Sequence, residues 1–223
     1  SPPKAAINPI STRSKPSFGA RIKARGGKGM STVVLASGNR GKLRELQHAL
    51  RDTPYNLIPQ GELGVPDAIE DGQTFIENAL IKARHGARLT GKHALADDSG
   101  LVVPALGGAP GIYSSRYSGK GDKANNDKLL AAMAGYQGDQ RRAWFICVLV
   151  FLSSADDPAP IVAEGRWHGF IAEDIRGEGG FGYDPIFVID GQGRTAAELS
   201  ADEKQALSHR GQAIAALRAK LGA

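Results

Sequence analysis

The chain has 223 residues, of which 41% are hydrophobic and 23% are charged, so it can bury one sizeable core and is not disordered throughout. Its net charge of +5 comes from residues 1–29, which hold seven of the 28 basic residues and no acidic residue; the remainder has a net charge of −2 and gives no evidence of a nucleic-acid-binding surface. No apolar run reaches the roughly 20 residues of a membrane-spanning helix, and the single cysteine, Cys147, excludes an intramolecular disulfide and favours a reducing, cytoplasmic location.

Residues 1–29 are predicted to be a disordered basic leader, and residues 30–223 a single domain. The leader is rich in Ser, Pro, Gly, Lys and Arg, and its apolar residues follow no helical or strand period. It lacks the apolar block of a secretory signal peptide, although Arg and Ser without acids are also typical of mitochondrial transit peptides. We favour an added leader or an upstream extension, because Met30 stands directly before the first predicted strand.

Helices and strands are predicted to alternate along the rest of the chain, beginning with a buried strand at residues 32–36. Leucines three and four residues apart then predict a helix, with Leu43, Leu46 and Leu50 on its apolar face. A strand, an acidic loop and a second helix follow at 55–58, 61–72 and 75–90. Thr74 and Glu77 form the signature of a capping box for that helix, and its expected core face carries Ile76, Leu80, Ala83 and Ala87.

The second half of the chain is predicted to contain longer strands and two glycine-rich loops. Short strands at 93–96 and 101–103 flank an acidic sequence. The further predicted elements are a loop at 107–121, a helix at 122–134, paired strands at 143–152 and 161–167, a glycine loop at 177–182 and a strand at 186–189. Ser200 and Glu203 predict another capping box, and the helical pattern beyond it breaks near 209–211. This order indicates an α/β protein with a mixed sheet.

The turn at residues 37–42 lies between a strand and a helix, where backbone N–H groups and the positive helix end favour an anion. Lys42 adds a point charge for phosphate. The turn is not a Walker A loop, because position 36 is Ala and Leu43 replaces Ser or Thr. By itself the pattern Gly-x-x-Gly-Lys is equally consistent with a plain strand-to-helix turn.

Residues 177–182 match the dinucleotide fingerprint formally, but a strand rather than a helix follows them, which excludes a Rossmann site. Two interpretations stay open. The segment is either a β-bulge or hairpin loop, or a flexible loop that lets backbone approach a ligand. In the second case Phe181 or Tyr183 could stack on a base.

The sequence Asp97-Asp98-Ser99-Gly100 is the strongest candidate for chemistry. Two adjacent acids between apolar segments are costly to bury without a partner, and Mg²⁺ prefers carboxylates together with phosphate oxygens. Because neighbours on a strand face opposite sides, one acid is expected to bind metal and the other to be structural or catalytic. Glu70 and Asp71 could complete the site, and a surface turn capped by Asp is the alternative.

Two further features are less specific. His209 and Arg210 near a helix break could donate to a carbonyl or a phosphate, or could form an ordinary polar helix end. Cys147 lies inside an apolar strand and is expected to pack in the core, because a catalytic thiol needs an exposed electropositive site.

Together these segments resemble the inosine triphosphate/xanthosine triphosphate pyrophosphatases, especially the bacterial members. The resemblance runs from about residue 32 to residue 221. The stretches that carry it are 37–42, 74–79, 82–84, 96–101, 107–114, 179–187 and 208–211. It implies an elongated mixed β-sheet flanked by helices, with two lobes and a nucleotide-binding cleft between them. It also implies a homodimer.

The family resemblance implies hydrolysis of ITP, dITP and XTP to the monophosphate and pyrophosphate, with Mg²⁺ or Mn²⁺ as cofactor. Asp98 is the expected proton acceptor, with Asp97 as the alternative, and Lys82 is expected to help neutralise charge. Asp98 and Glu70 are the expected metal ligands. The residues expected to bind the purine nucleoside triphosphate are Ser37, Gly38, Asn39, Arg40, Gly41, Lys42, Ser99, Phe181, Gly182, Tyr183, Asp184, Lys204, His209 and Arg210.

Three other functions were weighed against this one. One alternative is a related pyrophosphatase that acts on modified pyrimidine nucleotides, and activity on a panel of substrates distinguishes it from a purine-specific enzyme. A non-catalytic nucleotide sensor is disfavoured by the acids Glu70, Asp97 and Asp98. An RNA-binding module is suggested only by the leader, and the net charge of −2 of the remaining residues argues against it. No nucleic-acid or membrane partner is expected.

Removal of residues 1–29 should leave the melting temperature and the hydrolysis of ITP nearly unchanged, because this segment has no periodic apolar face to bury. Thermal unfolding and activity of the full and shortened chains test this. A drop of several degrees in the shortened chain would show that the leader packs against the fold.

Overall fold

The computed structural model describes residues 29–37 and 40–223, so the predicted leader lies almost wholly outside the described residues. The strands are β1 (Ser31–Leu35), β2 (Tyr55–Pro59), β3 (His93–Val102), β4 (Arg142–Leu152), β5 (Ile161–Ile171) and β6 (Phe187–Ile189). The helices are α1 (Arg40–Leu50), α2 (Phe75–Thr90), α3 (Asp122–Ala132), α4 (Ala201–Leu207) and α5 (His209–Leu221). These elements follow the predicted order of helices and strands closely.

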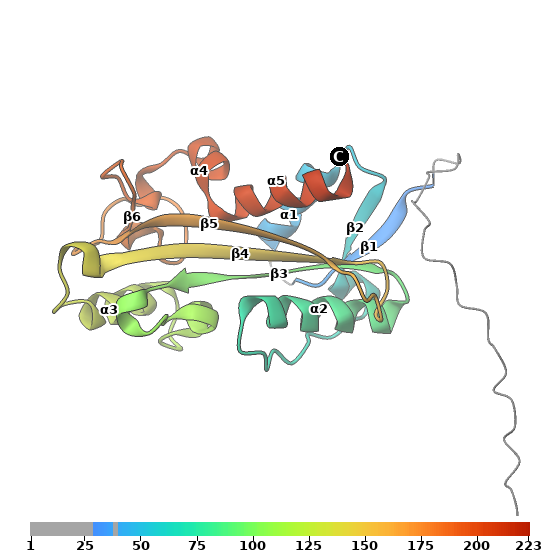
Figure 1. Cartoon of the computed structure of the whole chain (residues 1–223), viewed down its shortest axis with the longest axis horizontal. Coiled ribbons are helices and arrows are strands. Elements are labelled where there is room, and N and C mark those ends of the chain that lie inside the picture. Colours follow the sequence, from blue (N-terminus) through green and yellow to red (C-terminus); the bar gives the residue numbers. More distant parts are fainter. Residues whose placement is uncertain (1–28, 38–39) are drawn as a thin grey trace, which may run out of the picture.

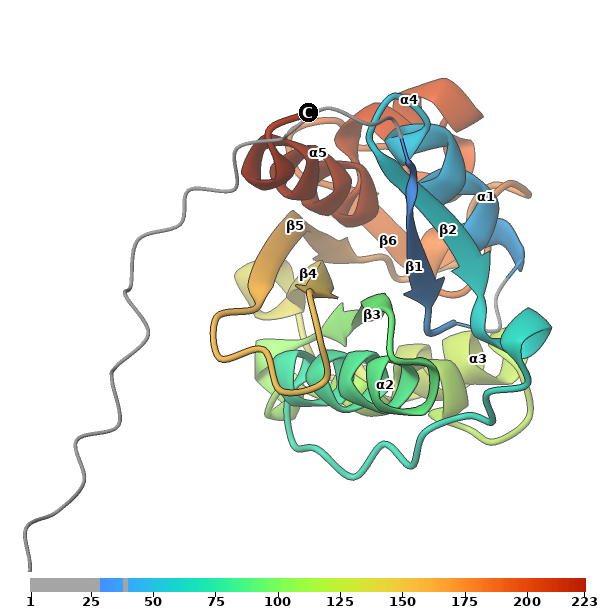
Figure 2. The same cartoon turned by 90° about the vertical axis from the view of Figure 1, so that its right-hand side faces the viewer.

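The described residues form one mixed sheet of six strands in the order β2-β1-β3-β4-β5-β6. The pairs β1–β2 and β1–β3 are parallel, and the pairs from β3 to β6 are antiparallel. The long strands β3, β4 and β5 run along the long axis of the molecule, with α1, α4 and α5 on one face and α2 and α3 on the other (Figures 1 and 2). The elongated, helix-flanked mixed sheet is therefore confirmed, while the division into two lobes with a cleft between them remains a prediction.

The apolar run that predicts a strand at 143–152 is buried on both faces of the sheet. Alternate side chains of β4 enter two clusters: Cys147, Leu149 and Phe151 pack with α1 and α5. Ile146, Val148, Val150 and Leu152 pack with α2 on the opposite face. A strand covered by helices on both sides has no polar face, which explains why its sequence is continuously apolar.

Strand β3 is longer than predicted and passes straight through the acidic sequence. Asp97, Asp98 and Ser99 pair with Leu149, Val148 and Cys147 of β4 in unbroken antiparallel register. The expectation of two separate short strands is therefore wrong, and so is the alternative of a surface turn capped by Asp. The long partner β4 supplies a hydrogen-bonding edge that carries the strand across the two acids.

Helix α2 lies on the sheet through small side chains. Ala79, Ala83 and Ala87 are buried against β1, β3 and β4. The helix begins as predicted, with the Thr74 hydroxyl accepting the Glu77 N–H. Ile76, however, is 41% exposed, so its expected place in the core is wrong. Phe75 packs against the alanine cluster instead and anchors the first turn of the helix.

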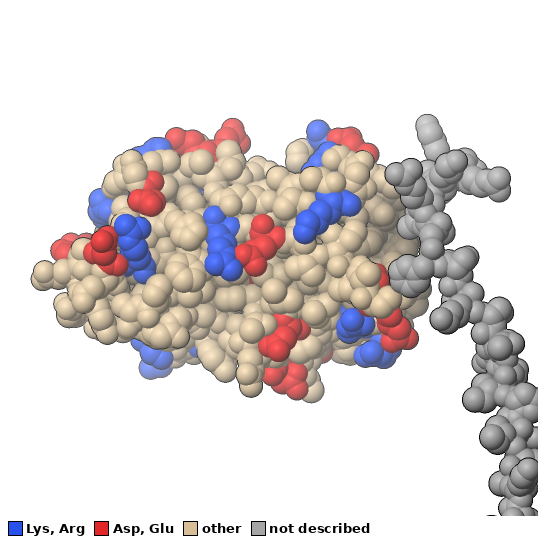
Figure 3. All heavy atoms as spheres, in the orientation of Figure 1, with Lys and Arg blue, Asp and Glu red and all other residues tan. Residues whose placement is uncertain are grey.

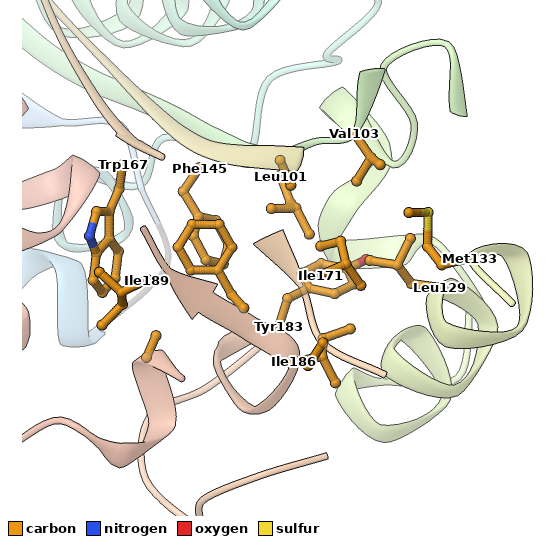
Figure 4. Close-up of a cluster of buried hydrophobic side chains, with 14 residues drawn as sticks. Leu101, Val103, Leu129, Met133, Phe145, Trp167, Ile171, Tyr183, Ile186 and Ile189 are labelled. Atoms are coloured by element: carbon orange, nitrogen blue, oxygen red, sulfur yellow. The ribbon is translucent and has the colours of Figure 1, made fainter. Parts of the chain in front are cut away.

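A third cluster fills the far end of the molecule, between β3, β4, β5, β6 and α3 (Figure 4). Leu129 and Met133 bring α3 into this cluster, as the sequence predicts, and Tyr183 and Ile186 bring in the segment before β6. The cluster therefore fixes α3 and the Tyr183 segment against the same end of the sheet.

The surface visible in Figure 3 mixes acidic and basic side chains. No continuous basic stripe crosses the described part of that face. None of the helices in residues 29–37 and 40–223 combines the length and the apolar character that crossing a bilayer requires.

Close packing of α5 on β5 gives a stability prediction. An added Cβ at Gly165 would lie 2.1 Å from the His209 carbonyl oxygen and 2.6 Å from the Ala213 nitrogen, both in helix backbone that cannot rotate away. Gly165→Ala should therefore displace α5 and lower the free energy of unfolding by about 1–3 kcal/mol, the usual cost of overpacking. Chemical denaturation measures this.

Gly135→Ala is the matched control, because an added Cβ at Gly135 meets no atom within 4 Å. Its effect should stay within about 0.5 kcal/mol, as for most surface substitutions. Equal stability of the two variants would contradict the close approach of α5 to β5.

Candidate active site

The candidate site lies where β1 ends beside β3. Helix α1 connects β1 to β2 on one face of the sheet, and α2 connects β2 to β3 on the other, so the chain leaves β1 and reaches β3 from opposite sides (Figure 2). Such a switch in direction opens a crevice at the carboxyl ends of parallel strands. In the described residues β1 pairs with β3 only as far as Leu95, two residues before Asp97.

The turn predicted to bind phosphate is only partly described. Gly38 and Asn39 lie outside the described residues, as does the side chain of Arg40. Ser37 and Lys42 belong to the described part, and Lys42 lies in the first turn of α1. The ammonium of Lys42 is therefore placed at the end of β1, where the helix dipole also favours an anion.

Asp97 faces α1 and is neutralised by Lys42. Its carboxylate is 3% exposed and lies 2.5 Å from the Lys42 ammonium. Burial alone would raise the pKa of Asp97, but Lys42, with Lys82 and Arg210 farther away, holds this pKa below its ordinary value. Asp97 is therefore the charged partner of a lysine in the first helix.

Asp98 faces the opposite side, toward α2, and is only partly neutralised. Lys82 of α2 lies 3.5 Å from Asp98 Oδ1 and 3.1 Å from Glu70 Oε2. Within the described chain, Asp98 Oδ2 is buried and has no hydrogen-bond partner. Burial raises the pKa of Asp98, opposed by Lys82 and reinforced by Glu70 and Asp97. Burial would lower the pKa of Lys82, but the three acids hold it above its ordinary value.

The loop that carries Glu70 is held by the start of α2. Gly72 donates its N–H to the buried amide oxygen of Asn78 at 2.9 Å, and Gln73 donates to Glu77 at 2.8 Å. An added Cβ at Gly72 would lie 2.7 Å from the same Asn78 oxygen. Glu70 thus approaches Lys82 from a loop that is fixed on both sides of residue 72.

A second group of residues presents an aromatic ring. Phe181 is 57% exposed, and the ammonium of Lys204 lies 4.2 Å from its ring centre. Buried Asp184 accepts the Phe181 N–H at 2.8 Å and also pairs with Lys204. The ring is therefore held in place by an ion pair and is available for stacking.

Tyr183 does not offer a comparable surface. It is 4% exposed, and its hydroxyl donates to the Ser114 carbonyl oxygen at 2.6 Å. Of the two aromatic residues predicted to stack on a base, Phe181 alone is exposed in the described structure. The expectation of stacking by Tyr183 is therefore wrong, because its ring fills the third hydrophobic cluster.

His209 and Arg210 open helix α5 rather than interrupt it. The break lies one residue earlier, at Ser208, whose hydroxyl caps α5 by accepting the Gly211 N–H at 3.1 Å. Arg210 donates to Glu45 of α1 at 3.0 Å. His209 stacks on Phe145 with ring centres 4.8 Å apart. Burial, aided by Arg210 and Lys204, lowers the pKa of His209 to about 3, so the ring is neutral at physiological pH.

Most of the predicted binding residues line one pocket of about 270 Å³. Its lining residues are Lys42, Ser99, Gly100, Leu101, Ser114, Ser115, Asp122, Phe145, Phe181, Gly182, Tyr183, Asp184, His209 and Arg210. Lys204 lines a second hollow, which shares Phe181, His209 and Arg210 with the first. The structure thus joins a lysine from α1, the strand residues after Asp98 and an exposed aromatic ring in one cavity.

Glu45, Ser114, Ser115 and Asp122 are site residues that the sequence analysis does not identify. Ser114 accepts the Leu101 N–H at 2.9 Å and so caps the edge of β3 that β1 leaves uncovered. Residues 107–114 contribute to the family resemblance, which is the signal that could have indicated Ser114. Glu45 and Asp122 have no such signal, because only the tertiary contacts bring them to the pocket.

Comparison with known proteins agrees with this geometry. The model of the Ham1 family matches residues 33–220. A dITP/XTP pyrophosphatase of Salmonella typhimurium is 56% identical over 187 residues, which cover 83% of this chain and 95% of that protein. One of Methylococcus capsulatus is 53% identical over 193 residues, covering 86% and 96%.

A solved structure supports the same grouping. The structure of a HAM1 protein from Coxiella burnetii superposes with a TM-score of 0.83 at 51% sequence identity, covering 86% of this chain and 99% of that one. The matched region includes every described residue assigned above to the pocket and to the carboxylate cluster. With its fold and nearly the whole described chain in agreement, the protein belongs to the Ham1 family.

Proposed function

We propose that this protein hydrolyses the non-standard purine nucleoside triphosphates dITP, ITP and XTP to the monophosphate and pyrophosphate. The observation that carries the proposal is the continuity of β3, which places the carboxylate cluster of Asp98 directly before Ser99 in the pocket with Phe181. The group proposed for phosphate chemistry and the pocket proposed for the base therefore meet at successive residues of one strand, whose side chains point to opposite faces of the sheet. The relatives named dITP/XTP pyrophosphatase support the same activity.

The carboxylate cluster fits a hard divalent cation such as Mg²⁺ or Mn²⁺. Asp98 and Glu70 converge on Lys82, and among the described residues Asp98 Oδ2 is buried without a partner. No group of three or more His, Cys, Asp or Glu side chains in the described chain could hold an ion by itself. Phosphate oxygens and water would have to complete the ligands, as is usual for Mg²⁺. When bound, the ion would neutralise charge on the phosphates and polarise them.

Lys42 and Lys82 are the residues proposed to bind the triphosphate. Lys42 and Lys82 lie on α1 and α2, on opposite faces of β3, so their ammonium groups approach the end of β1 from two sides. The acids around Lys82 keep its pKa raised, so that it stays charged. Positive groups fixed before the reaction stabilise the charge that develops on the departing pyrophosphate.

Asp98 is the better of the two candidates to accept the proton of the attacking water. Its Oδ2 is buried without a partner among the described residues, whereas the carboxylate of Asp97 is held in a close ion pair with Lys42. A carboxylate of raised pKa is the stronger base while it remains ionised. Asp97 then serves to hold Lys42 in position.

The purine base is proposed to stack on Phe181 and to be selected by Arg210. Hypoxanthine and xanthine carry a 6-oxo group where adenine carries a 6-amino group, so a donor in the pocket favours the first two. Arginine is donor only and does not depend on pH. Nε of Arg210 is buried without a partner in the described structure, while Nη1 is held by Glu45.

A homodimer and a cytoplasmic location remain predictions from the family resemblance and from the single cysteine.

The proposed reaction is tested by incubating purified protein with ITP, XTP, dITP, the four standard triphosphates and modified pyrimidine triphosphates. Release of pyrophosphate rather than phosphate is expected, with the three non-standard purine substrates preferred. Release of phosphate alone, or a preference for the pyrimidine substrates, would contradict the proposal.

Loss of the carboxylate charges should abolish most of the activity. Asp98→Asn and Glu70→Gln keep the shape of each side chain, so folding should survive, while turnover of ITP falls by roughly 10²–10⁴. EDTA should likewise stop the wild-type reaction. Asp139→Asn is the control, because this side chain is 84% exposed and belongs to neither the carboxylate cluster nor the pocket. Full activity in EDTA, or an unaffected Asp98→Asn protein, would refute the metal assignment.

Arg210→Ala should narrow the preference for ITP over ATP. A buried donor left without an acceptor costs about 1–3 kcal/mol, so kcat/KM for ITP should fall about 10- to 100-fold more than kcat/KM for ATP. Arg142→Ala, which changes a half-exposed arginine of β4, is the control. An equal loss for both substrates would show that Arg210 binds phosphate or supports the fold instead.

A further inference from the structure

Side chains of helix α3 form hydrogen bonds with the loop that carries Phe181. Gly182 donates its N–H to Asp122 Oδ2 at 2.9 Å, and its carbonyl oxygen accepts a hydrogen bond from Asn126 Nδ2 at 3.0 Å. Asp122 and Asn126 are four residues apart and therefore lie on the same side of α3. Both backbone polar groups of Gly182 are thus bound by side chains of one helix.

The same end of α3 also holds a second segment of the pocket lining. Buried Asn125 accepts the Ser118 N–H at 2.7 Å and donates to the carbonyl oxygens of Ser115 and Ser114 at 3.3 and 3.4 Å. The Tyr183 hydroxyl donates to the same Ser114 carbonyl. Since Ser114, Ser115 and Gly182 all line the pocket, side chains in the first half of α3 hold two segments of its lining.

These contacts require buried amides at positions where packing alone would favour apolar side chains. Asn125 and Asn126 are 2% and 4% exposed, and burial of an amide is costly unless it is hydrogen-bonded. The remainder of α3 is anchored by Leu129 and Met133, which lie in the cluster that also contains Tyr183 (Figure 4). The helix is therefore fixed to the core independently of Gly182, and its polar end can act as a support for the loop.

We propose that Asp122 and Asn126 are positioning residues for the nucleobase, which hold the Phe181 loop in its binding conformation before the nucleotide arrives. This inference rests on the proposed function. A loop ordered in advance loses less conformational entropy on binding, so binding is tighter. Affinity for the phosphate groups should not depend on Asp122 and Asn126, because the lysines proposed to bind the phosphates lie on α1 and α2.

The test compares ligands with and without a base. In Asp122→Ala and Asn126→Ala, the Kd of IMP and the KM for ITP should rise about tenfold, which corresponds to ~1.4 kcal/mol. The Kd of inorganic tripolyphosphate, which has no base, should change less than about twofold, and kcat should stay near the wild-type value. Amide hydrogen exchange of residues 180–184 should become faster, because the N–H of Gly182 loses its acceptor or the loop loses its support.

Conservative and control variants separate positioning from stability. Asp122→Asn retains an oxygen that accepts the Gly182 N–H and should behave as wild type in IMP binding and exchange. Asn126→Asp keeps the shape but places an acceptor against the Gly182 carbonyl, so it should reproduce the selective loss. Asp127→Ala removes an exposed acid of the same helix, which pairs with Lys123 at 2.8 Å, and should change nothing.

The inference is overturned if the Asp122 and Asn126 variants bind IMP and exchange amides as the wild type does. It is also overturned if tripolyphosphate binding weakens as much as IMP binding. A wild-type protein that hydrolyses no ITP would overturn the proposed function instead. In that event the exchange rates of residues 180–184 still decide whether Asp122 and Asn126 hold the loop.

Discussion

Two adjacent carboxylates inside a central strand set the constraint on which the site depends. Strand alternation sends Asp97 and Asp98 to opposite faces of the sheet, and a buried charge without a partner costs several kcal/mol. Each face must therefore supply a cation, which is Lys42 from α1 and Lys82 from α2. The need to neutralise β3 thus ties both helix layers to the same short stretch of strand and concentrates charge where β1 ends.

The two carboxylates differ in how completely their negative charges are neutralised, and this difference is the basis of the roles proposed for them. Asp97 has a close ion pair with Lys42, and its pKa is lowered. Asp98 shares Lys82 with Glu70, and its pKa is raised by burial. One acid is thereby committed to structure, whereas the other retains the capacity to bind a cation or a proton. Environments that push the pKa values of neighbouring carboxylates apart are typical of catalytic pairs.

The part of the site proposed to bind the base is held together by elements that are distant in sequence. Phe181 is held by Asp184 and Lys204, and Gly182 by Asp122 and Asn126. Helix α5 approaches β5 so closely that only a glycine fits at position 165, which fixes the backbone of His209 against the sheet. A pocket that is rigid before binding can discriminate between bases by single donors and acceptors, because mismatched groups cannot move to new partners.

Local sequence patterns were sufficient for much of the fold. The leucine spacing of α1, the capping residues Thr74 and Ser200 and the apolar run of β4 predict elements that the structure contains. These features depend on interactions between residues that are close in the chain, such as helical periodicity and capping, and can therefore be recognised in the sequence. The family resemblance also indicated Asp98, Lys204 and Arg210 as residues of one site.

Tertiary structure alone decided how those residues are used. The continuity of β3 through Asp97 and Asp98 depends on pairing with β4, some fifty residues away in the sequence. The exposure of Ile76 and the burial of Tyr183 depend on which neighbours fill the core. Asp122 and Asn126 reach Gly182 across more than fifty residues of chain. No periodic pattern encodes such contacts, because they are selected by the packing of whole elements and by the pairing of buried polar groups.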